Sequence, residues 1–191
     1  MAEKKKVLHV GCGPLNPKKL FRSFRGPEWQ EIRLDINPEM EPDIVNSIID
    51  MKDVPTNSMD AVWSSHNLEH LFAHEVTIAL AEFHRVLLPG GFVLITLPDI
   101  QAVARVIAEG NMDDALFESP AGPISPIDVI WGLRSAIANG NEYMAHKTGF
   151  TSASLKRQLM EASFIDPLME HKGYNLWAVA NKAANQAPIP S

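Results

Sequence analysis

The chain has 191 residues, a net charge of −6 and one cysteine, and these values exclude several classes of protein. Its length suits one domain with a substantial core, and 46% hydrophobic with 21% charged residues argues against wholesale disorder and against a membrane protein. Cys12 alone forms no internal disulfide and is too little for a cysteine-based metal site. Because the only basic block is the short run at 4–6, nucleic acid is a disfavoured partner.

No segment of the sequence suits a membrane span or a secretory signal. The apolar runs fall short of the ~18 residues needed to cross a bilayer. The N-terminal MAEKKK precedes a strand-like segment rather than an apolar signal core. We therefore expect no membrane contact and a cytoplasmic location.

Strand-like and helix-like segments alternate from one end of the chain to the other. The stretch VLHVGCGPLN at 7–16 predicts a buried strand, over 7–10, that enters a glycine-rich turn. Six more strands are expected at 31–35, 43–46, 60–63, 92–97, 166–170 and 176–181.

One helix is predicted between the fourth and fifth strands, ending at the Pro-Gly-Gly break at 89–91. Its apolar face is formed by Val76, Leu80, Phe83 and Leu87. The alternation predicts an α/β fold: a Rossmann-like, doubly wound, mainly parallel seven-stranded sheet with helices on both faces. Ligands of such sheets bind at the carboxyl ends of the strands, where the strand order reverses.

Residues 99–147 do not continue the alternation of strands and helices. They predict a helical insertion after the fifth strand, with one helix over 127–138. The insertion emerges at the ligand-facing edge, so it can act as an apolar lid that selects a hydrophobic acceptor. Its apolar residues can equally pack the added helices or form a homodimer contact; they include Met112, Phe117, Ile124, Ile127, Ile130 and Trp131. We expect a single domain over 1–182, with a last helix capped by Thr151 or Ser152, and a flexible tail over 183–191.

The glycine loop after the first strand is a candidate ligand site. Gly11 and Gly13 let the backbone approach a ligand closely, although a glycine pair after a strand is often only a tight turn. The dinucleotide fingerprint G-x-G-x-x-G requires a third glycine where the chain has Asn16, which weakens a nicotinamide or flavin interpretation.

Acidic residues follow two of the later strands. Asp35 ends the strand IRLD, where a carboxylate can accept hydrogen bonds from both hydroxyls of a ribose. Asp50 follows the third strand and can accept from an exocyclic amine such as that of adenine, with Met51 as an apolar contact to the ring. Each aspartate alone is also an ordinary turn or surface residue. Their order on successive strands strengthens the prediction of a nucleoside site.

At this point the sequence resembles a known family, the class I methyltransferases that depend on S-adenosylmethionine, of the small-molecule type. The motifs that carry the resemblance are VLHVGCGPLN, LDINP, DIVNSIIDM, SMDAVWSSHNLEHL and ALAEFHRVLLPGGFVLITLPD, over about residues 6–98. The resemblance implies S-adenosylmethionine as the cofactor and a small molecule as the methyl acceptor. It assigns Gly11, Cys12 and Gly13 to the methionine part, Asp35 and Ile36 to the ribose, Asp50 and Met51 to the adenine, and Ser64 or Ser65 to closure of the site.

The chain departs from the family pattern at two positions. Family members usually carry an acidic residue where this chain has His9, and a further glycine where it has Leu15. The first change weakens anchoring of the cofactor's amino group, and the second narrows the loop. A catalytically degenerate cofactor-binding module that acts through a protein partner is therefore the alternative function.

Histidines are the candidate acceptor-side groups, because methyl transfer requires positioning and at most a base, for which histidine is best matched near neutral pH. His66 and His70 are four residues apart in SSHNLEH, a spacing that also suits a metal pair. No third ligand is evident and Glu69 is expected to point elsewhere, so no metal is expected. We predict His66 and His146 as the catalytic residues.

Overall fold

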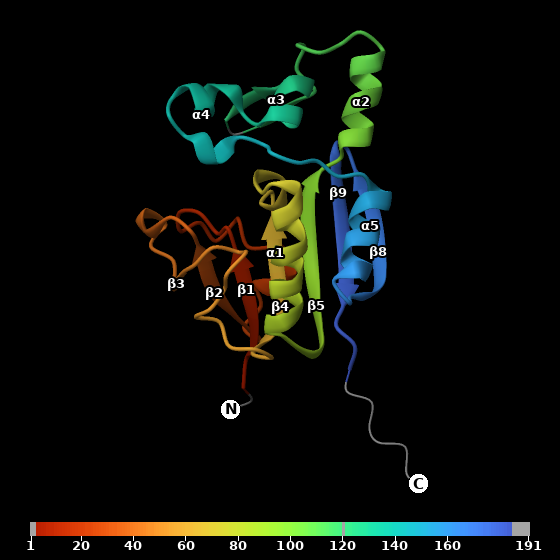
Figure 1. The fold of residues 1–191 in the computed structure, drawn as a ribbon. Coiled ribbons are helices and arrows are strands. Elements are labelled where there is room, and N and C mark those ends of the chain that lie inside the picture. The colour runs from red at the N-terminus through yellow and green to blue at the C-terminus, as the bar shows by residue number, and fades with distance from the viewer. Residues whose placement is uncertain (1–2, 120, 185–191) are drawn as a thin grey trace.

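The computed structural model describes residues 3–119 and 121–184, which are built around one seven-stranded sheet (Figure 1). Its order is β3-β2-β1-β4-β5-β9-β8, with β9 antiparallel to both neighbours and the other pairs parallel. The strands are β1 (Lys5–Val10), β2 (Trp29–Asp35), β3 (Ile44–Val45), β4 (Met59–Ser65), β5 (Leu87–Pro98), β8 (Ile165–Lys172) and β9 (Asn175–Asn181). This confirms the α/β fold class. The strand order reverses between β1 and β4, which places the ligand-binding edge at their carboxyl ends.

The junction between helix α1 (Ala73–Val86) and β5 differs from the prediction. Leu87, expected on the helical face, is instead the first residue of β5, although it is still fully buried. The helix stops early because a proline at 89 forces the residue before it into an extended conformation. A side-chain carbon at Gly91 would lie 2.9 Å from the carbonyl oxygens of Asp60 and Leu88, so only glycine lets the strand pass there.

The two faces of the sheet are covered differently. On one face, α1 and α5 (Ser152–Glu161) bury apolar side chains in the main core. Helices were expected on both faces, but the connection over 11–28 contains only the 3-10 turn η1 (Arg22–Phe24). It is interrupted by Pro14, Pro17, Gly26 and Pro27. Aromatic side chains cover this second face instead, in a cluster of Phe21, Phe24, Trp29, Trp63, Phe92 and Trp177.

The insertion, here called the cap (residues 99–147), sits over the carboxyl ends of the strands (Figure 1). It comprises α2 (Ile100–Ala108), the hairpin β6 (Phe117–Ser119) and β7 (Gly122–Ile124), α3 (Pro126–Trp131), α4 (Arg134–Ala138) and η4 (Glu142–Met144). The single helix predicted over 127–138 is wrong, because the chain breaks at Gly132, whose φ is +93°. A side-chain carbon there would lie 1.9 Å from the carbonyl oxygen of Met144, so the break lets η4 pack against α3.

The two remaining short turns, η2 (Pro38–Met40) and η3 (Leu68–His70), follow β2 and β4. The last helix, α5, begins as expected after Thr151, whose hydroxyl accepts a hydrogen bond from the backbone N–H of Ser154. Among the helices that the structure describes, none combines the length and apolar character needed to cross a membrane. The tail expected over 183–191 lies outside the described residues from 185 onward.

Candidate functional site

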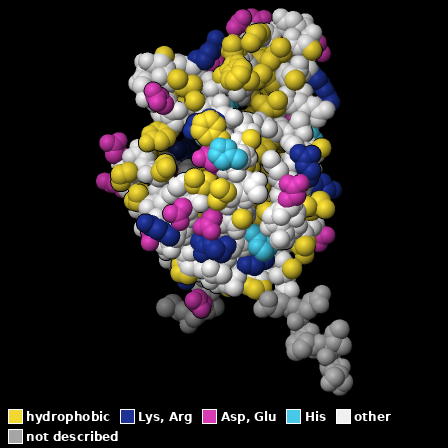
Figure 2. Space-filling view, in the orientation of Figure 1, with side chains coloured by type: hydrophobic (Ala, Val, Ile, Leu, Met, Phe, Trp, Pro, Cys, Tyr) yellow, Lys and Arg dark blue, Asp and Glu magenta, His cyan; other side chains and the backbone are white. Residues whose placement is uncertain are grey.

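A cavity of about 1370 Å³ lies where the cap meets the carboxyl ends of β1, β2, β4 and β5. Figure 2 shows a hollow on this side of the molecule, between the cap and the sheet, bordered largely by hydrophobic side chains. Seven residues indicated by the sequence line the cavity: Gly11, Gly13, Asp35, Ile36, Ser65, His66 and His146. Four others are not part of the lining: Cys12, Asp50, Met51 and Ser64.

The glycine loop (residues 11–13) borders the cavity with bare backbone. Gly11 and Gly13 have φ angles of +59° and +60°, which glycine adopts without strain. A side-chain carbon on Gly11 would lie 2.7 Å from the amide of Asn67, and one on Gly13 would lie 2.5 Å from Nζ of Lys19. A side chain at either position would therefore be strained, and the loop lies against two side chains, Asn67 and Lys19, that the sequence did not indicate.

Asp35 holds the glycine loop to the end of β2. Its Oδ2 accepts a hydrogen bond from the N–H of Gly13 at 2.8 Å, and its Oδ1 accepts one from the N–H of Asn37 at 3.0 Å. The side chain is largely buried but still lines the cavity. Because each carboxylate oxygen has a second lone pair, Asp35 can still accept hydrogen bonds from a ligand hydroxyl. The neighbouring Ile36 is 54% exposed and presents an apolar surface there.

The predicted adenine contacts do not reach the cavity. Met51 is fully buried in the main core, where its N–H donates to Glu82 and its carbonyl accepts from Arg85. Asp50 lies outside the cavity lining, beyond a tight turn that pairs it with Ser47. The residues that line this end of the cavity are 46–49. In this structure the cavity therefore meets the chain after β3 at 46–49 rather than at Asp50 and Met51.

Two further predicted residues face away from the cavity. Cys12 is 1% exposed, its N–H donates to the carbonyl of Leu34, and burial raises the pKa of its thiol. Ser64 is fully buried, whereas the next residue, Ser65, lines the cavity. Successive side chains of a strand point to opposite faces, so only one of the two serines can reach a ligand.

The two departures from the family pattern are accommodated without disrupting the fold. His9 is buried, and its Nδ1 lies 2.6 Å from Oε1 of Glu31 on the neighbouring strand. Burial lowers the pKa of His9, and the nearby Glu31 carboxylate partly opposes this shift. Leu15 is 74% exposed and constrains nothing around it. His9 lines the cavity, as do four basic residues of the connection after the glycine loop: Lys18, Lys19, Arg22 and Arg25.

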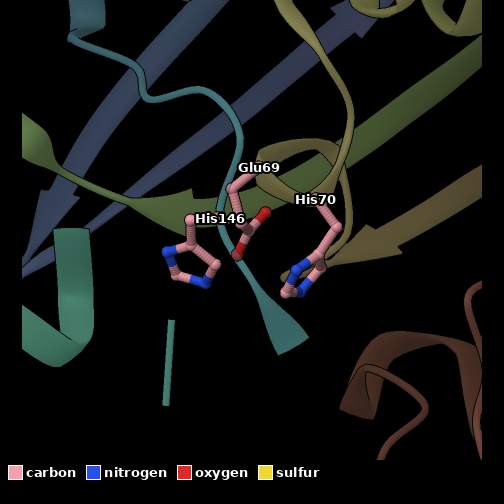
Figure 3. Close-up of side chains that lie close together, drawn as sticks. All are labelled: Glu69, His70 and His146. Atoms are coloured by element: carbon pink, nitrogen blue, oxygen red, sulfur yellow. The ribbon is translucent and has the colours of Figure 1, made fainter. Parts of the chain in front are cut away.

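At the cap end of the cavity, three titratable side chains converge from distant parts of the chain (Figure 3). Glu69 and His70 belong to η3, and His146 lies on the segment that returns from the cap. Their potential ligand atoms all lie within 4.8 Å of one another. The expectation that Glu69 points elsewhere is therefore wrong, and the third member missing from the sequence pattern is His146.

The carboxylate of Glu69 is fully buried next to three imidazoles. Nδ1 of His66 lies 3.3 Å from its Oε1, and the backbone of His66 has a φ of +50°, which is uncommon outside glycine. Burial alone would raise the pKa of Glu69, but the neighbouring His66 and His70 outweigh it and lower that pKa. Burial lowers the pKa of His146, and the nearby Glu69 carboxylate partly opposes this shift.

Comparison with known proteins identifies the domain that carries this cavity. Residues 8–95 match a family model described as a methyltransferase domain, and the match contains the glycine loop, Asp35 and η3. These residues form a methyltransferase domain of the S-adenosylmethionine-dependent type. No curated protein matches its sequence.

Solved structures share the fold of this methyltransferase. A methyltransferase of Methanosarcina mazei is 16% identical, with a TM-score of 0.62, and the match covers 97% of this chain and 95% of that one. A methyltransferase of Archaeoglobus fulgidus is 15% identical, with a TM-score of 0.61, and the match covers 94% of this chain and 86% of that one. The 1,6-didemethyltoxoflavin-N1-methyltransferase of Burkholderia thailandensis, with that compound and S-adenosylhomocysteine bound, is 14% identical, with a TM-score of 0.55 and coverages of 95% and 72%. The methyltransferase spans only 63% of a matching Bordetella parapertussis protein and about half of three other matches.

S-adenosylmethionine is the cofactor of this family, and the cavity fits such a group. Gly11 and Gly13 line the cavity without side chains of their own, so a ligand there meets loop backbone together with the side chains of Asn67 and Lys19 that lie beside the two glycines. When bound, S-adenosylmethionine supplies a methyl group on a positively charged sulfur, already activated for displacement. The methyltransferase itself has to bind, orient and shield the reactants.

Proposed function

We propose that this methyltransferase alkylates a small molecule bound in the cavity between the sheet and the cap. The size of the cavity carries the proposal. Its volume of about 1370 Å³ exceeds the roughly 300–1,000 Å³ typical of a pocket for one ligand, so an acceptor has room beside the cofactor. The B. thailandensis neighbour, whose structure holds a small molecule together with S-adenosylhomocysteine, supports this class of acceptor.

The cofactor lies along the carboxyl ends of β1 and β2 in this proposal. Its methionine part rests on the glycine loop, and its ribose hydroxyls donate to Asp35 beside Ile36. Ser47 and Ile48, which line the cavity after β3, take the role first predicted for Asp50 and Met51 at the adenine. Cys12 and Ser64 do not contact the cofactor in this proposal. The side chain of Cys12 packs beneath the glycine loop, and that of Ser64 packs beneath the end of β4.

Basic side chains next to the glycine loop suit the carboxylate of the cofactor's methionine part. Nζ of Lys19 lies directly above Gly13, at the place where a side-chain carbon would come within 2.5 Å of it. An ammonium group in this position attracts a carboxylate and donates hydrogen bonds to it. Lys19 thus anchors the end of the cofactor opposite the adenine, where His9 replaces the family's acidic residue.

The acceptor occupies the cap end of the cavity. Phe117, Ile124 and Val129 contribute apolar lining there and help to exclude water from the transfer. Holding the acceptor atom in line with the methyl group is worth up to about 7–11 kcal/mol of barrier reduction. An acceptor that carries a proton must lose it, and His66 and His146 are the imidazoles placed to accept it.

The proposal is tested by measuring S-adenosylhomocysteine formed from S-adenosylmethionine with a panel of apolar phenols, amines and carboxylic acids. At least one acceptor should raise product formation well above the acceptor-free background. His66→Ala should lower kcat with that acceptor, and His74→Ala, which removes an exposed histidine of α1, should not. Binding of S-adenosylhomocysteine without turnover on any small molecule would overturn the proposal and favour a cofactor-binding module that acts through a protein partner.

A further inference from the structure

The cluster of Glu69, His70 and His146 joins the cap to the sheet. The carbonyl oxygen of Glu69 accepts hydrogen bonds from the N–H groups of Lys147 (2.8 Å) and Thr148 (3.2 Å), which fixes the returning segment against η3. The rings of His70 and His146 meet edge to face with centroids 4.9 Å apart. Figure 3 shows the Glu69 carboxylate between the two rings.

The carboxylate of Glu69 lacks hydrogen-bond partners. The residue is 1% exposed, and neither Oε1 nor Oε2 has a hydrogen-bond partner among the described residues. An ionised carboxylate buried in this way is costly unless a positive charge or hydrogen-bond donors compensate it. Nδ1 of His66, 3.3 Å from Oε1, offers a positive charge only when that imidazole is protonated, whereas a cation bound beside the carboxylate would compensate it directly.

Both imidazoles are oriented by backbone carbonyls. Nδ1 of His70 lies 3.1 Å from the carbonyl oxygen of Ala145, and Nδ1 of His146 lies 2.8 Å from that of Val129. A carbonyl oxygen only accepts hydrogen bonds, so each Nδ1 carries the proton and each Nε2 keeps a free lone pair. This pairing of one ring nitrogen with a carbonyl is the arrangement that orients histidine ligands around metal ions.

We propose that Glu69, His70 and His146 bind a divalent transition-metal ion of the zinc class. Two imidazole nitrogens and one carboxylate oxygen are a donor set that suits Zn²⁺ and leaves a fourth position open. Ligands at zinc bond lengths stand roughly 3.4 Å apart in a tetrahedral site. Atoms that already lie within 4.8 Å of one another reach this geometry through small side-chain rotations.

The ion has two consequences for the cavity. It ties the cap segment that carries His146 to η3, so it holds the lid against the sheet. All three ligands border the cavity, so the open position can hold an oxygen or nitrogen atom of the methyl acceptor. This second consequence rests on the proposed function. It makes His146 a ligand and leaves proton acceptance to His66.

The test is metal analysis of the full chain after treatment with a chelator and reconstitution with Zn²⁺, Mn²⁺ or Mg²⁺. The wild type should retain about one equivalent of Zn²⁺ after desalting, and Zn²⁺ should raise its Tm. Glu69→Gln and His146→Ala should each weaken Zn²⁺ binding by more than about tenfold, because loss of even an outer-shell partner costs about 10- to 100-fold. His74→Ala is the matched control and should bind Zn²⁺ as the wild type does.

Glu69→Gln also guards against misfolding as an explanation. It keeps the side-chain shape, and a cooperative thermal transition of the metal-free variant, measured beside that of the metal-free wild type, shows that the variant is folded. Any of three results would overturn the proposal. These are a wild type that retains no Zn²⁺, a wild type that binds Mg²⁺ more tightly than Zn²⁺, and a Glu69→Gln variant that binds Zn²⁺ as tightly as the wild type. S-adenosylhomocysteine binding, measured on the same samples, reports the cofactor site separately. Failure of the metal site is thereby distinguished from failure of the proposed function.

Discussion

Replacement of Asp35 by alanine tests the placement of the cofactor. The carboxylate accepts two backbone hydrogen bonds, from Gly13 at 2.8 Å and from Asn37 at 3.0 Å, and its remaining lone pairs face the proposed ribose. When a charged acceptor is removed, a donor that is left without a hydrogen-bond partner costs about 1–3 kcal/mol of free energy. Here the donors are the ribose hydroxyls of the bound ligand. Affinity for S-adenosylhomocysteine should therefore fall by about 5- to 150-fold, because 1.4 kcal/mol corresponds to a factor of ten.

The assay is a calorimetric titration at a temperature where the variant is folded, since the loop also loses its anchor and the Tm should drop. Asp43→Ala is the matched control. Asp43 also accepts a backbone hydrogen bond, from Arg33 at 2.7 Å, but it lies outside the cavity lining, so its loss should leave affinity unchanged. Wild-type affinity in folded Asp35→Ala would refute the ribose placement.

Three further predictions concern the loop and the cap. Gly11→Ala places a carbon 2.7 Å from Asn67 at a φ of +59°, so S-adenosylhomocysteine affinity measured by calorimetry should fall, with partial recovery in the double variant Gly11→Ala/Asn67→Gly. Gly132→Ala meets the carbonyl of Met144 at 1.9 Å, so limited proteolysis should cut the cap faster, and an unchanged cleavage rate would contradict this account. Burial alone would raise the pKa of Asp128, but hydrogen bonds from its arginine and serine neighbours outweigh it and hold that pKa well below its usual range. The stability it adds is present above the unfolded pKa of about 3.9 and lost as pH falls through the folded value, so the Tm difference between wild type and Asp128→Asn should shrink in acid.

The sheet could be predicted because its signals are local. Runs such as VLHV and FVLITL are apolar without alternation, and each became a strand buried on both faces. The break at Gly132 could not be predicted, because it depends on the approach of Met144, twelve residues away. The aromatic cover of the second face likewise arises from contacts between distant residues, such as Trp63 and Trp177.

The same distinction between local and distant signals runs through the site. The glycine loop and Asp35 follow strands directly, so the sequence places them at the ligand edge. The burial of Met51 could not be predicted, because it depends on the turn after β3 that directs this side chain into the core. His146 lies next to Glu69 only after the cap folds back over the sheet. The sequence motif LEH therefore shows Glu69 and His70 side by side but gives no sign that His146 joins them.

The central claim, a cofactor site on the glycine loop, is tested most directly by calorimetric titration of the wild-type chain with S-adenosylhomocysteine, with NAD as the control ligand. The account predicts one S-adenosylhomocysteine site of micromolar affinity and no binding of NAD. Absence of S-adenosylhomocysteine binding would contradict this claim, and binding of NAD instead would show that the loop holds a different cofactor.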